Sequence, residues 1–380
     1  MRRLVGVAAL ALGTGVFVAL ATKRRGFFDL HVYYGAIRYW IRDGGQLYDY
    51  LRPPTEYGFT YPPFAALTML PMAVVPWPVA IVISALLTVG AAGLVLWWLI
   101  APRTRPVWVA LAVAACLLAA FEPMRETFLF GQINAVLLAL VLGDVLFLRR
   151  FAGVGIGLAT AIKLTPGIFI LYLLVVGRWR AALVASGTAA GATLLAAAIA
   201  PDASRIFWTE ALWNTDRIGD LAYISNQSLR GLVARSGGSG AVWLLLVAAV
   251  LAFWVWRVRR VPLLTGVALT GVVGGLISPV TWVHHLVWLV PALVLLVFSR
   301  SPWRLALAAG CYVILCSRLV WSWRNDYSGL DGFVFGNAYV WVSLALLLAL
   351  PRGQDVADLG EVDRLAGRGD AERVAGPVGG

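Results

Sequence analysis

Apolar stretches recur along most of this chain, and they constrain its fold more than any other feature. They lie at about 4–21, 77–100, 107–121, 131–148, 152–177, 181–200, 240–256, 261–277, 285–299, 303–319 and 336–350. A helix needs about 20 apolar residues to cross a bilayer, and most of these stretches approach that length. Charged residues make up only 13% of the 380 residues, about half of their share in a soluble domain. The sequence therefore predicts an all-α polytopic membrane protein in contact with the lipid bilayer.

Arginines mark the connections between these stretches and predict how the chain is oriented. They are Arg2 and Arg3, Arg103 and Arg105, Arg149 and Arg150, Arg178 and Arg180, Arg257, Arg259 and Arg260, Arg300 and Arg304, and Arg352. Short loops rich in arginine stay in the cytoplasm. We therefore expect about twelve segments with both termini cytoplasmic, and external loops at about 22–76, 122–130, 163–166, 201–238, 278–284 and 320–335. These loops explain the net charge of +12 without a nucleic-acid partner.

Two segments depart from this simple alternation. The stretch 152–177 lies between two basic connections, so it must return to the side from which it started. Pro166 cannot continue a helix, which predicts a broken hairpin with Lys163 at its tip. Lys23, Arg24 and Arg25 fall outside in this topology, against the positive-inside rule.

The two ends of the chain have different characters. Residues 1–21 resemble a signal peptide, but the basic run that follows them favours an uncleaved first transmembrane helix, with cleavage as the alternative. Residues 1–350 then form one transmembrane domain, and residues 351–380 form a disordered cytoplasmic tail. Cys116, Cys311 and Cys316 lie in apolar stretches, where packing is the expected role, and no metal site is expected.

Polar and aromatic residues gather in the segments that are predicted to be external. The candidates are Asp29, His31, Arg38, Tyr61, Gln132, Asn134, Lys163, Asn226, Gln227, His284 and His285. Polar groups near lipid are costly, so such a set marks function. An acid, several cations, amides and aromatic rings at one membrane face are what an interfacial active site requires. The periodicity of residues 30–42 predicts an amphipathic helix at the interface.

Six stretches between residues 27 and 285 have the order seen in a known family. They are FDLHVYYGA, GFTYPPF, FGQINAVLLALVLGD, AIKLTP, NQSLRG and SPVTWVHH. In these the chain resembles the actinobacterial polyprenyl-phosphate-mannose-dependent alpha-mannosyltransferases of glycosyltransferase family 87, which belong to the multispanning GT-C class. The resemblance implies a GT-C-like fold, a polyprenyl-phosphate-mannose donor, and a glycolipid acceptor of the phosphatidylinositol mannoside or lipomannan type. It also implies inverting transfer of mannose at the outer face of the cytoplasmic membrane.

The resemblance further implies roles for individual residues. The catalytic carboxylate of the GT-C class lies in the first external loop, where this chain has Asp29. A second acid often lies beside it, but here the position is His31, which favours a mechanism without metal or cofactor. Donor phosphate or sugar would be bound by a wider set. That set is Lys163, His284, His285, Gln132, Asn134, Tyr61, Arg38, Asn226 and Gln227.

Structural roles remain open for several of these residues. Asp29 is also a favourable N-cap, and the amine of Lys163 can extend to the interface from a helix end. Asp144 lies near the cytoplasmic end of its stretch, where we expect it to pair with a loop arginine. A transporter or flippase of lipid-linked sugars is an alternative function, although such proteins place their sites between related halves at mid-membrane. Another is a GT-C enzyme with a different polyprenyl-phosphate sugar, such as arabinofuranose.

Overall fold

Helices form most of the described chain, and the long loop at residues 42–62 separates α2 (Phe28–Ile41) from α3 (Pro63–Thr68). The computed structural model describes residues 2–22, 25–214, 219–299 and 301–352. The longer helices are α1 (Arg2–Ala21), α2 (Phe28–Ile41), α4 (Trp77–Ile100), α5 (Val107–Ala120), α6 (Glu122–Phe130), α7 (Asn134–Phe147), α8 (Val154–Ile162), α9 (Ile168–Val175), α10 (Trp179–Ile199), α13 (Gly240–Val258), α14 (Leu263–Ile277), α15 (Val290–Val297), α16 (Pro302–Ser317) and α18 (Ala338–Ala349).

Short helices complete the connections. They are α3 (Pro63–Thr68), η1 (Leu70–Ala73), η2 (Ala101–Arg103), η3 (Thr165–Gly167), α11 (Pro201–Ile206), η4 (Phe207–Ala211), α12 (Leu229–Arg235), η6 (Val283–Leu289), η7 (Leu319–Trp323) and α17 (Gly329–Phe335). Among the described residues the only β pairing is an isolated bridge between Leu51 and Gly58. The fold is therefore all-α, as the sequence predicts. The tail from residue 353 on, together with Lys23 and Arg24, lies outside the described residues.

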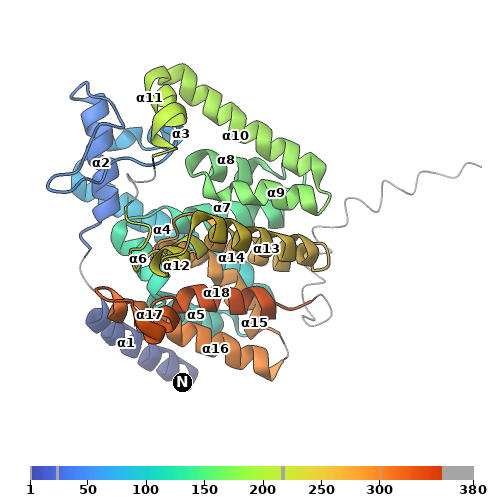
Figure 1. The fold of residues 1–380 in the computed structure, drawn as a ribbon. Coiled ribbons are helices and arrows are strands. Elements are labelled where there is room, and N and C mark those ends of the chain that lie inside the picture. Colours follow the sequence, from blue (N-terminus) through green and yellow to red (C-terminus); the bar gives the residue numbers. More distant parts are fainter. Residues whose placement is uncertain (1, 23–24, 215–218, 300, 353–380) are drawn as a thin grey trace, which may run out of the picture.

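Helix α14 lies at the centre of the bundle and packs against α9, α13, α18 and η6 (Figure 1). It is apolar on every side, which is typical of a helix surrounded by other helices. Glycines allow its neighbours to come close. A Cβ at Gly266 would lie 2.5 Å from the Tyr172 hydroxyl, and one at Gly271 would lie 3.1 Å from the backbone oxygen of Trp288.

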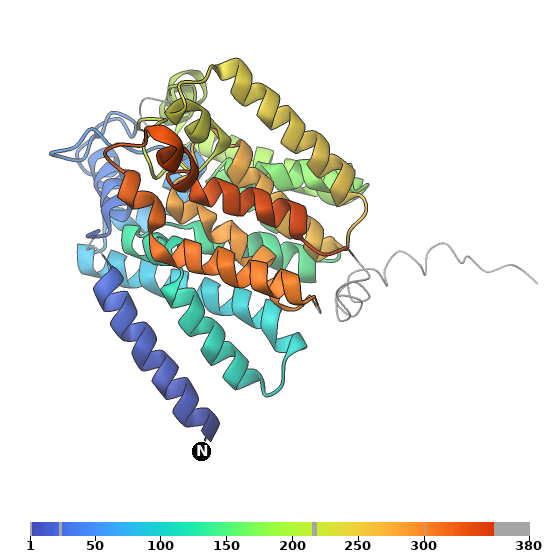
Figure 2. The same ribbon diagram turned by 60° about the horizontal axis from the view of Figure 1, so that its bottom comes forward.

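Large apolar side chains cover the outer faces of several helices. Leu86 on α4 is 68% exposed, Leu183 on α10 is 73% exposed, and Leu245 on α13 is 71% exposed. Helix α1 packs beside α5 at the edge of the bundle (Figure 2) and has no buried residue. A monomeric soluble protein does not present so much apolar surface to water. The outer faces of these helices therefore identify a membrane protein.

Four helices of the described chain are long and apolar enough to cross a membrane: α1, α4 with η2, α10 and α13. Two bent pairs, α5 with α6 at 72° and α17 with α18 at 51°, raise the number to six if each pair is one span. Five further apolar segments have 10–17 residues. The structure thus supports several membrane helices, and length and composition alone identify fewer spans than the twelve segments expected from the sequence.

The hairpin expected at residues 152–177 is present. Helix α8 ends at Ile162, Lys163 is extended with φ −147° and ψ 129°, and α9 starts five residues later. Gly153, before α8, lies against the first turn of α10, because a Cβ there would be 2.2 Å from the backbone oxygen of Ala181. At the other end, the Arg178 N–H donates to the Leu173 oxygen at 2.8 Å. Both ends of the hairpin therefore lie at the start of α10.

Asp144 has a role at this end of the hairpin. Its carboxylate accepts hydrogen bonds from the backbone N–H groups of Gly153 at 2.7 Å and Ile156 at 3.0 Å. These N–H groups belong to the start of α8, where a helix has no partners of its own for them. The sequence predicted a loop arginine as the partner of Asp144, whereas the structure shows that the carboxylate caps α8.

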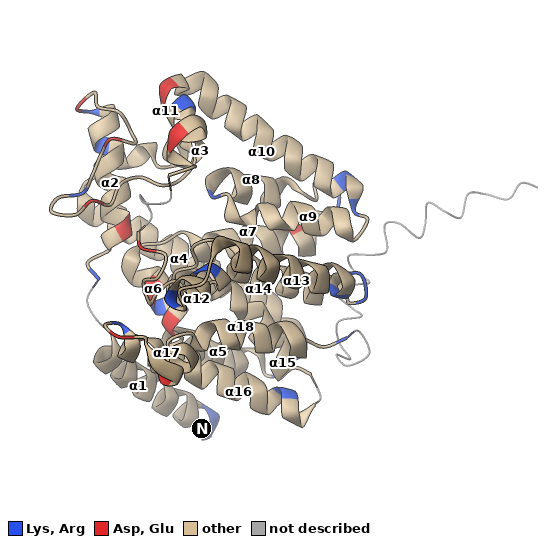
Figure 3. Cartoon of the chain, in the orientation of Figure 1, with Lys and Arg blue, Asp and Glu red and all other residues tan. Residues whose placement is uncertain are grey.

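Charged residues are distributed unevenly between the two ends of the bundle (Figure 3). Arginines lie together near the start of α10, the end of α13 and the start of α16, on the right in that view. Arg259 donates to the Val175 oxygen at 3.3 Å, and Arg257 donates to the Leu348 oxygen at 2.8 Å. Most acidic residues lie at the other end, around α2, α6 and α11. The sequence predicts that the arginine-rich connections lie on one side of the membrane, and their grouping at one end of the bundle is consistent with this.

Candidate active site

Asp29 lies in the first turn of α2, directly after a tight turn. Gly26 and Phe27 both have positive φ, at 62° and 51°, and the Phe27 N–H donates to the Leu129 oxygen of α6 at 3.0 Å. Gly131, after α6, brings the two helices together. It has φ +71°, and a Cβ there would lie 2.5 Å from the Cβ of Leu30. Only glycine allows this conformation and this approach without strain.

Gln132 connects Asp29 to the rest of the site. Its Nε2 donates to Asp29 Oδ2 at 2.6 Å and to the Tyr33 hydroxyl at 3.2 Å. Its Oε1 accepts a hydrogen bond from the Tyr61 hydroxyl at 2.6 Å. Because a carboxylate only accepts hydrogen bonds, the amide nitrogen has to face Asp29. The Gln132 side chain therefore has one orientation in this network.

Lys163 brings a buried amine to the far side of Tyr61, and burial lowers the pKa of this amine to about 7 although the charge of Asp29 raises it in part. Its Nζ donates to Asn134 Oδ1 at 3.0 Å and to the Tyr61 hydroxyl at 3.4 Å, and lies 5.1 Å from the centre of the Tyr61 ring. It also lies 2.9 Å from His285 Nε2. Because α8 ends at Ile162, the Lys163 side chain can reach these partners in the site. Lys163 is only 8% exposed.

The backbone determines which nitrogen of His285 carries its proton. The Trp282 N–H donates to His285 Nδ1 at 3.1 Å, so a neutral ring carries its proton on Nε2. That N–H faces the Lys163 amine, which is itself a donor when charged. With both groups protonated, neither nitrogen can accept a hydrogen bond from the other across 2.9 Å. An anionic oxygen beside the pair, within reach of both nitrogens, would accept a hydrogen bond from each.

His284 is held by its backbone rather than by its ring. Its carbonyl oxygen accepts hydrogen bonds from the Thr127 hydroxyl at 2.9 Å and from Asn134 Nδ2 at 3.3 Å. The ring packs edge-on against His285, with centroids 4.6 Å apart. Its buried Nε2 has no hydrogen-bond partner among the described residues. A buried polar atom of this kind is available to a ligand that brings an acceptor or donor.

The surroundings of Asp29 suit a general base. Burial raises the pKa of this carboxyl from 3.8 to about 6, while the Gln132 hydrogen bond and the charges of Lys163 and Arg52 lower it in part. A base whose pKa lies just below neutral is ionised at pH 7 and still able to take up a proton. Within the described ranges, no three His, Cys, Asp or Glu side chains are grouped so that they could hold a metal ion.

Aromatic side chains gather near the start of α2, where Asp29 lies. Phe28 and Tyr57 meet edge to face at 5.6 Å, and Tyr223 and Trp282 do so at 6.0 Å. Gly219 lies between the two pairs, because a Cβ there would be 3.5 Å from the Tyr57 hydroxyl and 3.7 Å from Trp282. Tyr57 is 46% exposed and Tyr223 is 37% exposed. These rings thus form an open aromatic rim, made of Phe28, Tyr57, Tyr223 and Trp282.

The structure brings together seven of the residues expected from the sequence and places four others elsewhere. Asp29, Tyr61, Gln132, Asn134, Lys163, His284 and His285 lie in the site. Arg38 lies nine residues beyond Asp29, about 13 Å along the axis of α2. It donates to the Tyr34 hydroxyl at 3.1 Å. His31 is exposed and packs on Trp77, with ring centroids 4.7 Å apart.

Asn226 and Gln227 are fully buried, and the structure shows them bound to backbone. Asn226 donates to the Leu221 and Pro279 oxygens, and its Oδ1 accepts from the Thr281 N–H at 2.9 Å. Gln227 donates to the Ile224 and Gly336 oxygens at 2.7 and 2.9 Å. The Asn226 amide therefore fixes the turn that leads into His284 and His285. The Gln227 amide joins its own loop to the backbone at Gly336 and Tyr339.

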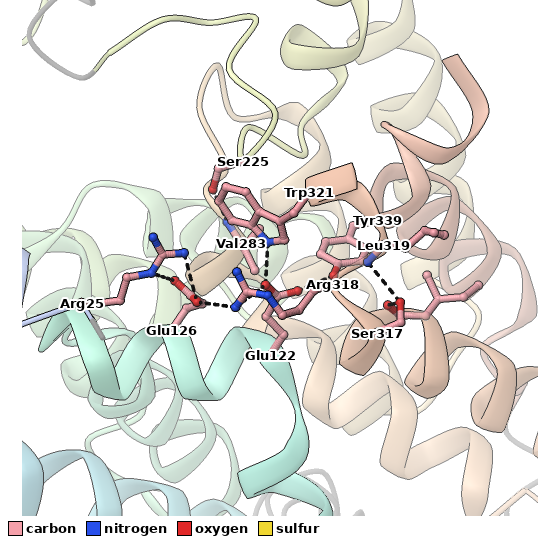
Figure 4. Close-up of polar contacts among 11 residues, drawn as sticks. Arg25, Glu122, Glu126, Ser225, Val283, Ser317, Arg318, Leu319, Trp321 and Tyr339 are labelled. Atoms are coloured by element: carbon pink, nitrogen blue, oxygen red, sulfur yellow. Dashed lines mark hydrogen bonds and ion pairs between the residues drawn. The ribbon is translucent and has the colours of Figure 1, made fainter. Parts of the chain in front are cut away.

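Two parts of the site were not singled out from the sequence. Arg52 lies in the loop before the Thr60-Tyr61 turn and contributes to the electrostatics of Asp29. Glu126 forms ion pairs with Arg25 at 3.0 Å and Arg318 at 3.2 Å (Figure 4). The sequence offered one indirect signal for these pairs, namely the unusual external charge at residues 23–25.

Comparison with known proteins identifies the family of this chain. The model of glycosyltransferase family 87 matches residues 59–279. A polyprenol-phosphate-mannose-dependent alpha-(1-2)-phosphatidylinositol mannoside mannosyltransferase of Mycolicibacterium smegmatis is 34% identical over 368 residues, which cover 85% of this chain and 83% of the relative. A protein of the same name from Mycobacterium tuberculosis is 34% identical over 360 residues, which cover 84% and 83%.

A second protein of Mycolicibacterium smegmatis, a polyprenol-phosphate-mannose-dependent alpha-(1-2)-phosphatidylinositol pentamannoside mannosyltransferase, is 35% identical over 287 residues. The match covers 70% of this chain and 68% of that protein. No solved structure matches the chain at a significant level. The family model covers more than half of the chain, and the relatives are similar over most of its length. The chain therefore belongs to glycosyltransferase family 87 and is a membrane-bound glycosyltransferase.

Proposed function

We propose that this protein transfers mannose from polyprenyl-phosphate-mannose to a glycolipid of the phosphatidylinositol mannoside type, with inversion at the anomeric carbon. The observation that carries this proposal is the pairing of a partly buried carboxylate with a buried cation in one site. Asp29 and Lys163 face the site from opposite ends of the Gln132–Tyr61 network. The names of the relatives support both the donor and the acceptor class.

Asp29 is the base in this mechanism. It takes the proton of an acceptor hydroxyl while the oxygen of that hydroxyl attacks the anomeric carbon of the mannose. The bond between that carbon and the phosphate oxygen breaks on the opposite face, and polyprenyl phosphate leaves with the bonding electrons. A β-linked donor thus gives an α-linked product in one displacement, and no covalent enzyme intermediate forms.

Lys163 and His285 stabilise the leaving phosphate. Their two nitrogens are 2.9 Å apart, so both could donate to one phosphate oxygen that lies beside the pair. Asn134 holds the Lys163 amine in place at 3.0 Å, so little reorganisation is needed as negative charge develops. The unpartnered Nε2 of His284 is a further candidate contact to the donor.

The aromatic rim is the proposed binding surface for the acceptor sugar. The faces of aromatic rings pack well against the apolar faces of pyranose rings, while hydroxyls at the edge of the sugar remain free to react. Tyr57 and Trp282 approach the site from two different loops, and Phe28 is the residue before Asp29. An acceptor mannose on this rim would place a hydroxyl next to the base.

The topology expected from the arginine connections places this site on the outer face of the cytoplasmic membrane. In this proposal residues 1–350 form one domain of about twelve segments, several of them short or broken, and the first external loop carries Asp29. Cysteine labelling in a cysteine-free background tests it. Asn226, His284 and Arg257 are buried, so exposed positions in the same loops carry the label. We expect labelling from outside at positions 56, 213 and 279, and only from the cytoplasm at 149, 178 and 259. Outside labelling at both 149 and 178 would contradict it.

Transfer of radiolabelled mannose from polyprenyl-phosphate-mannose to phosphatidylinositol mannosides, with purified protein in lipid nanodiscs, tests the reaction itself. We expect a product one mannose longer, in an α-(1→2) linkage as in the names of the relatives. The same preparation is supplied with polyprenyl-phosphate-arabinofuranose as the competing donor. Transfer of arabinose and not mannose would replace the proposed donor, and movement of intact donor across the bilayer without transfer would favour a flippase.

A further inference from the structure

Helix α6 carries two buried carboxylates one turn apart on the same face. Glu122 is fully buried and Glu126 is 2% exposed. Glu126 accepts hydrogen bonds from Arg25 Nε at 3.0 Å and Arg25 Nη2 at 3.3 Å, and from Arg318 Nη1 at 3.2 Å (Figure 4). A buried charge is costly unless it is paired and hydrogen-bonded. Arg25 and Arg318 satisfy this requirement for Glu126.

Glu122 connects α6 to the C-terminal part of the fold. It accepts hydrogen bonds from Trp321 Nε1 at 2.6 Å and from the Tyr339 hydroxyl, and Arg318 lies 3.5 Å from it. Arg318 thus bridges the two glutamates. The guanidinium of Arg25 also lies over the ring of Trp321 at 5.4 Å. Residues from both ends of the chain therefore meet on one face of α6.

The other contacts of α6 lead directly to the site. Thr127 donates to the backbone oxygen of His284, and Gln132 follows the end of the helix and binds Asp29. Arg25 lies four residues before Asp29 in the chain. The two residues that follow Arg25, Gly26 and Phe27, both have positive φ, a conformation that persists only where the surroundings hold it.

We propose that Glu126 is a positioning residue for Asp29, and that it acts by holding Arg25 and so fixing the turn from which α2 starts. Two attachments then hold this turn to α6: the Arg25–Glu126 pair before it and the hydrogen bond from Phe27 to Leu129 within it. The pair also neutralises an arginine that the predicted topology places outside the membrane. This inference rests on the proposed function, in which Asp29 is the catalytic base.

Charge gives the proposal a readout that a purely structural role would not produce. Lys163 and Arg52 lower the pKa of Asp29, Glu126 raises it, and Gln132 binds the carboxylate. Neutral Tyr33, Tyr57 and Tyr61 complete the surroundings. Removing the charge of Glu126 should therefore lower the pKa of Asp29, and it also releases the positive charge of Arg25. Removing Arg25 leaves the charge of Glu126 in place.

Two variants that break the same ion pair should therefore differ in their pH dependence. With Glu126→Gln we expect kcat to fall about tenfold with the donor KM within a factor of two, and the acidic limb of the kcat profile to move about half a pH unit lower. With Arg25→Gln we expect a similar fall in kcat, without a shift of the limb to lower pH. Arg25→Lys should recover part of the activity that Arg25→Gln loses.

The matched control is Glu210→Gln, which breaks an ion pair with Arg205 at 3.9 Å, where both side chains are more than half exposed. It should leave kcat and the pH profile unchanged. If Glu126→Gln does not fold, as judged by gel filtration, the comparison of Arg25→Gln with Arg25→Lys decides, because Arg25 is partly exposed. The proposal would be overturned if Glu126→Gln and Arg25→Gln both had the kinetics of the control. It would also be overturned if the acidic limbs of the two variants moved in the same direction. Absence of transfer by the wild type would instead overturn the proposed function.

Discussion

Replacing Asp29 by asparagine removes the proposed base and keeps the size of the side chain. The sequence left open that Asp29 caps a helix, but the N-cap of α2 is Phe27 and Asp29 lies inside the first turn. The side-chain oxygen of asparagine can accept the same hydrogen bond from Gln132. The structure should therefore survive while the base is lost. General-base catalysis contributes about 10²- to 10⁴-fold, which corresponds to about 3–5 kcal/mol of the activation barrier. We expect kcat to fall by that factor.

The same substitution should make the protein more stable. Burial raises the pKa of Asp29 from 3.8 to about 6, so the ionised carboxylate destabilises the folded state at pH 7. The difference between these pKa values corresponds to about 3 kcal/mol, and we expect about 1 kcal/mol because solvent screens part of this charge. A carboxyl whose pKa is raised by folding lowers the stability of the folded state most at pH values above its folded-state pKa. The gain in stability from Asp29→Asn should therefore be largest above pH 6 and shrink as the pH falls from about 6 to 3.8.

Both effects are measured on one preparation. Transfer from polyprenyl-phosphate-mannose gives kcat, and thermal unfolding in detergent at pH 8 and pH 5 gives the change in stability. Asp29→Asn with kcat within tenfold of the wild type would refute the role of base. A variant less stable than the wild type at pH 8 would show that the ionised carboxylate stabilises this helix start, and would refute the electrostatic reasoning.

Four further predictions concern the site. The kcat/KM of the wild type should fall about tenfold per pH unit below pH 6, because Asp29 must be ionised to act; a profile that is flat down to pH 4.5 would contradict this. Lys163→Met should lower kcat/KM for the donor by about 10- to 100-fold, since a charged hydrogen-bond donor contributes about 1.5–3 kcal/mol; steady-state kinetics with varied donor measure it. Tyr57→Ala should raise the KM for the acceptor about tenfold and leave the KM for the donor unchanged, and the reverse pattern would remove the aromatic rim from the acceptor site. Gly131→Ala should destabilise the protein by about 1–3 kcal/mol, because its φ is positive and its Cβ would clash with α2; Gly90→Ala, which meets open space, should unfold at no lower temperature.

Sequence reasoning succeeded where an element had a local cause. The break after α8 follows from Pro166 and from the two basic connections on either side of the hairpin. The meeting of Asp29, Gln132, Lys163 and His285 follows from placing their loops on one face and from motifs that occur in the order of a known family. The same argument could not tell which polar side chains point into the site.

The departures have physical reasons of two kinds. Arg38 lies on the same helix as Asp29, but more than two turns further along, and its guanidinium packs over the Tyr34 ring. Asn226 and Gln227 bind backbone groups of a buried turn, a need that only the folded chain creates. The pairs of Glu126 join residues 101 and 192 positions apart, a separation at which no local pattern exists. The number of membrane spans also depends on tertiary structure. The length of a short or bent helix does not show whether that helix crosses the membrane.

The Gln132–Tyr61 network has a consequence for reactivity. Asp29 and Lys163 carry opposite charges in one enclosed space, where a direct ion pair would be strongly attractive. Such a pair would hold the carboxylate ionised at low pH and weaken it as a base. One neutral amide and one phenol lie between the two groups and act as a spacer. The Asp29 carboxylate can therefore still take up a proton, and the Lys163 amine can still bind an anion. A substrate with a hydroxyl for Asp29 and a phosphate for Lys163 would use both groups.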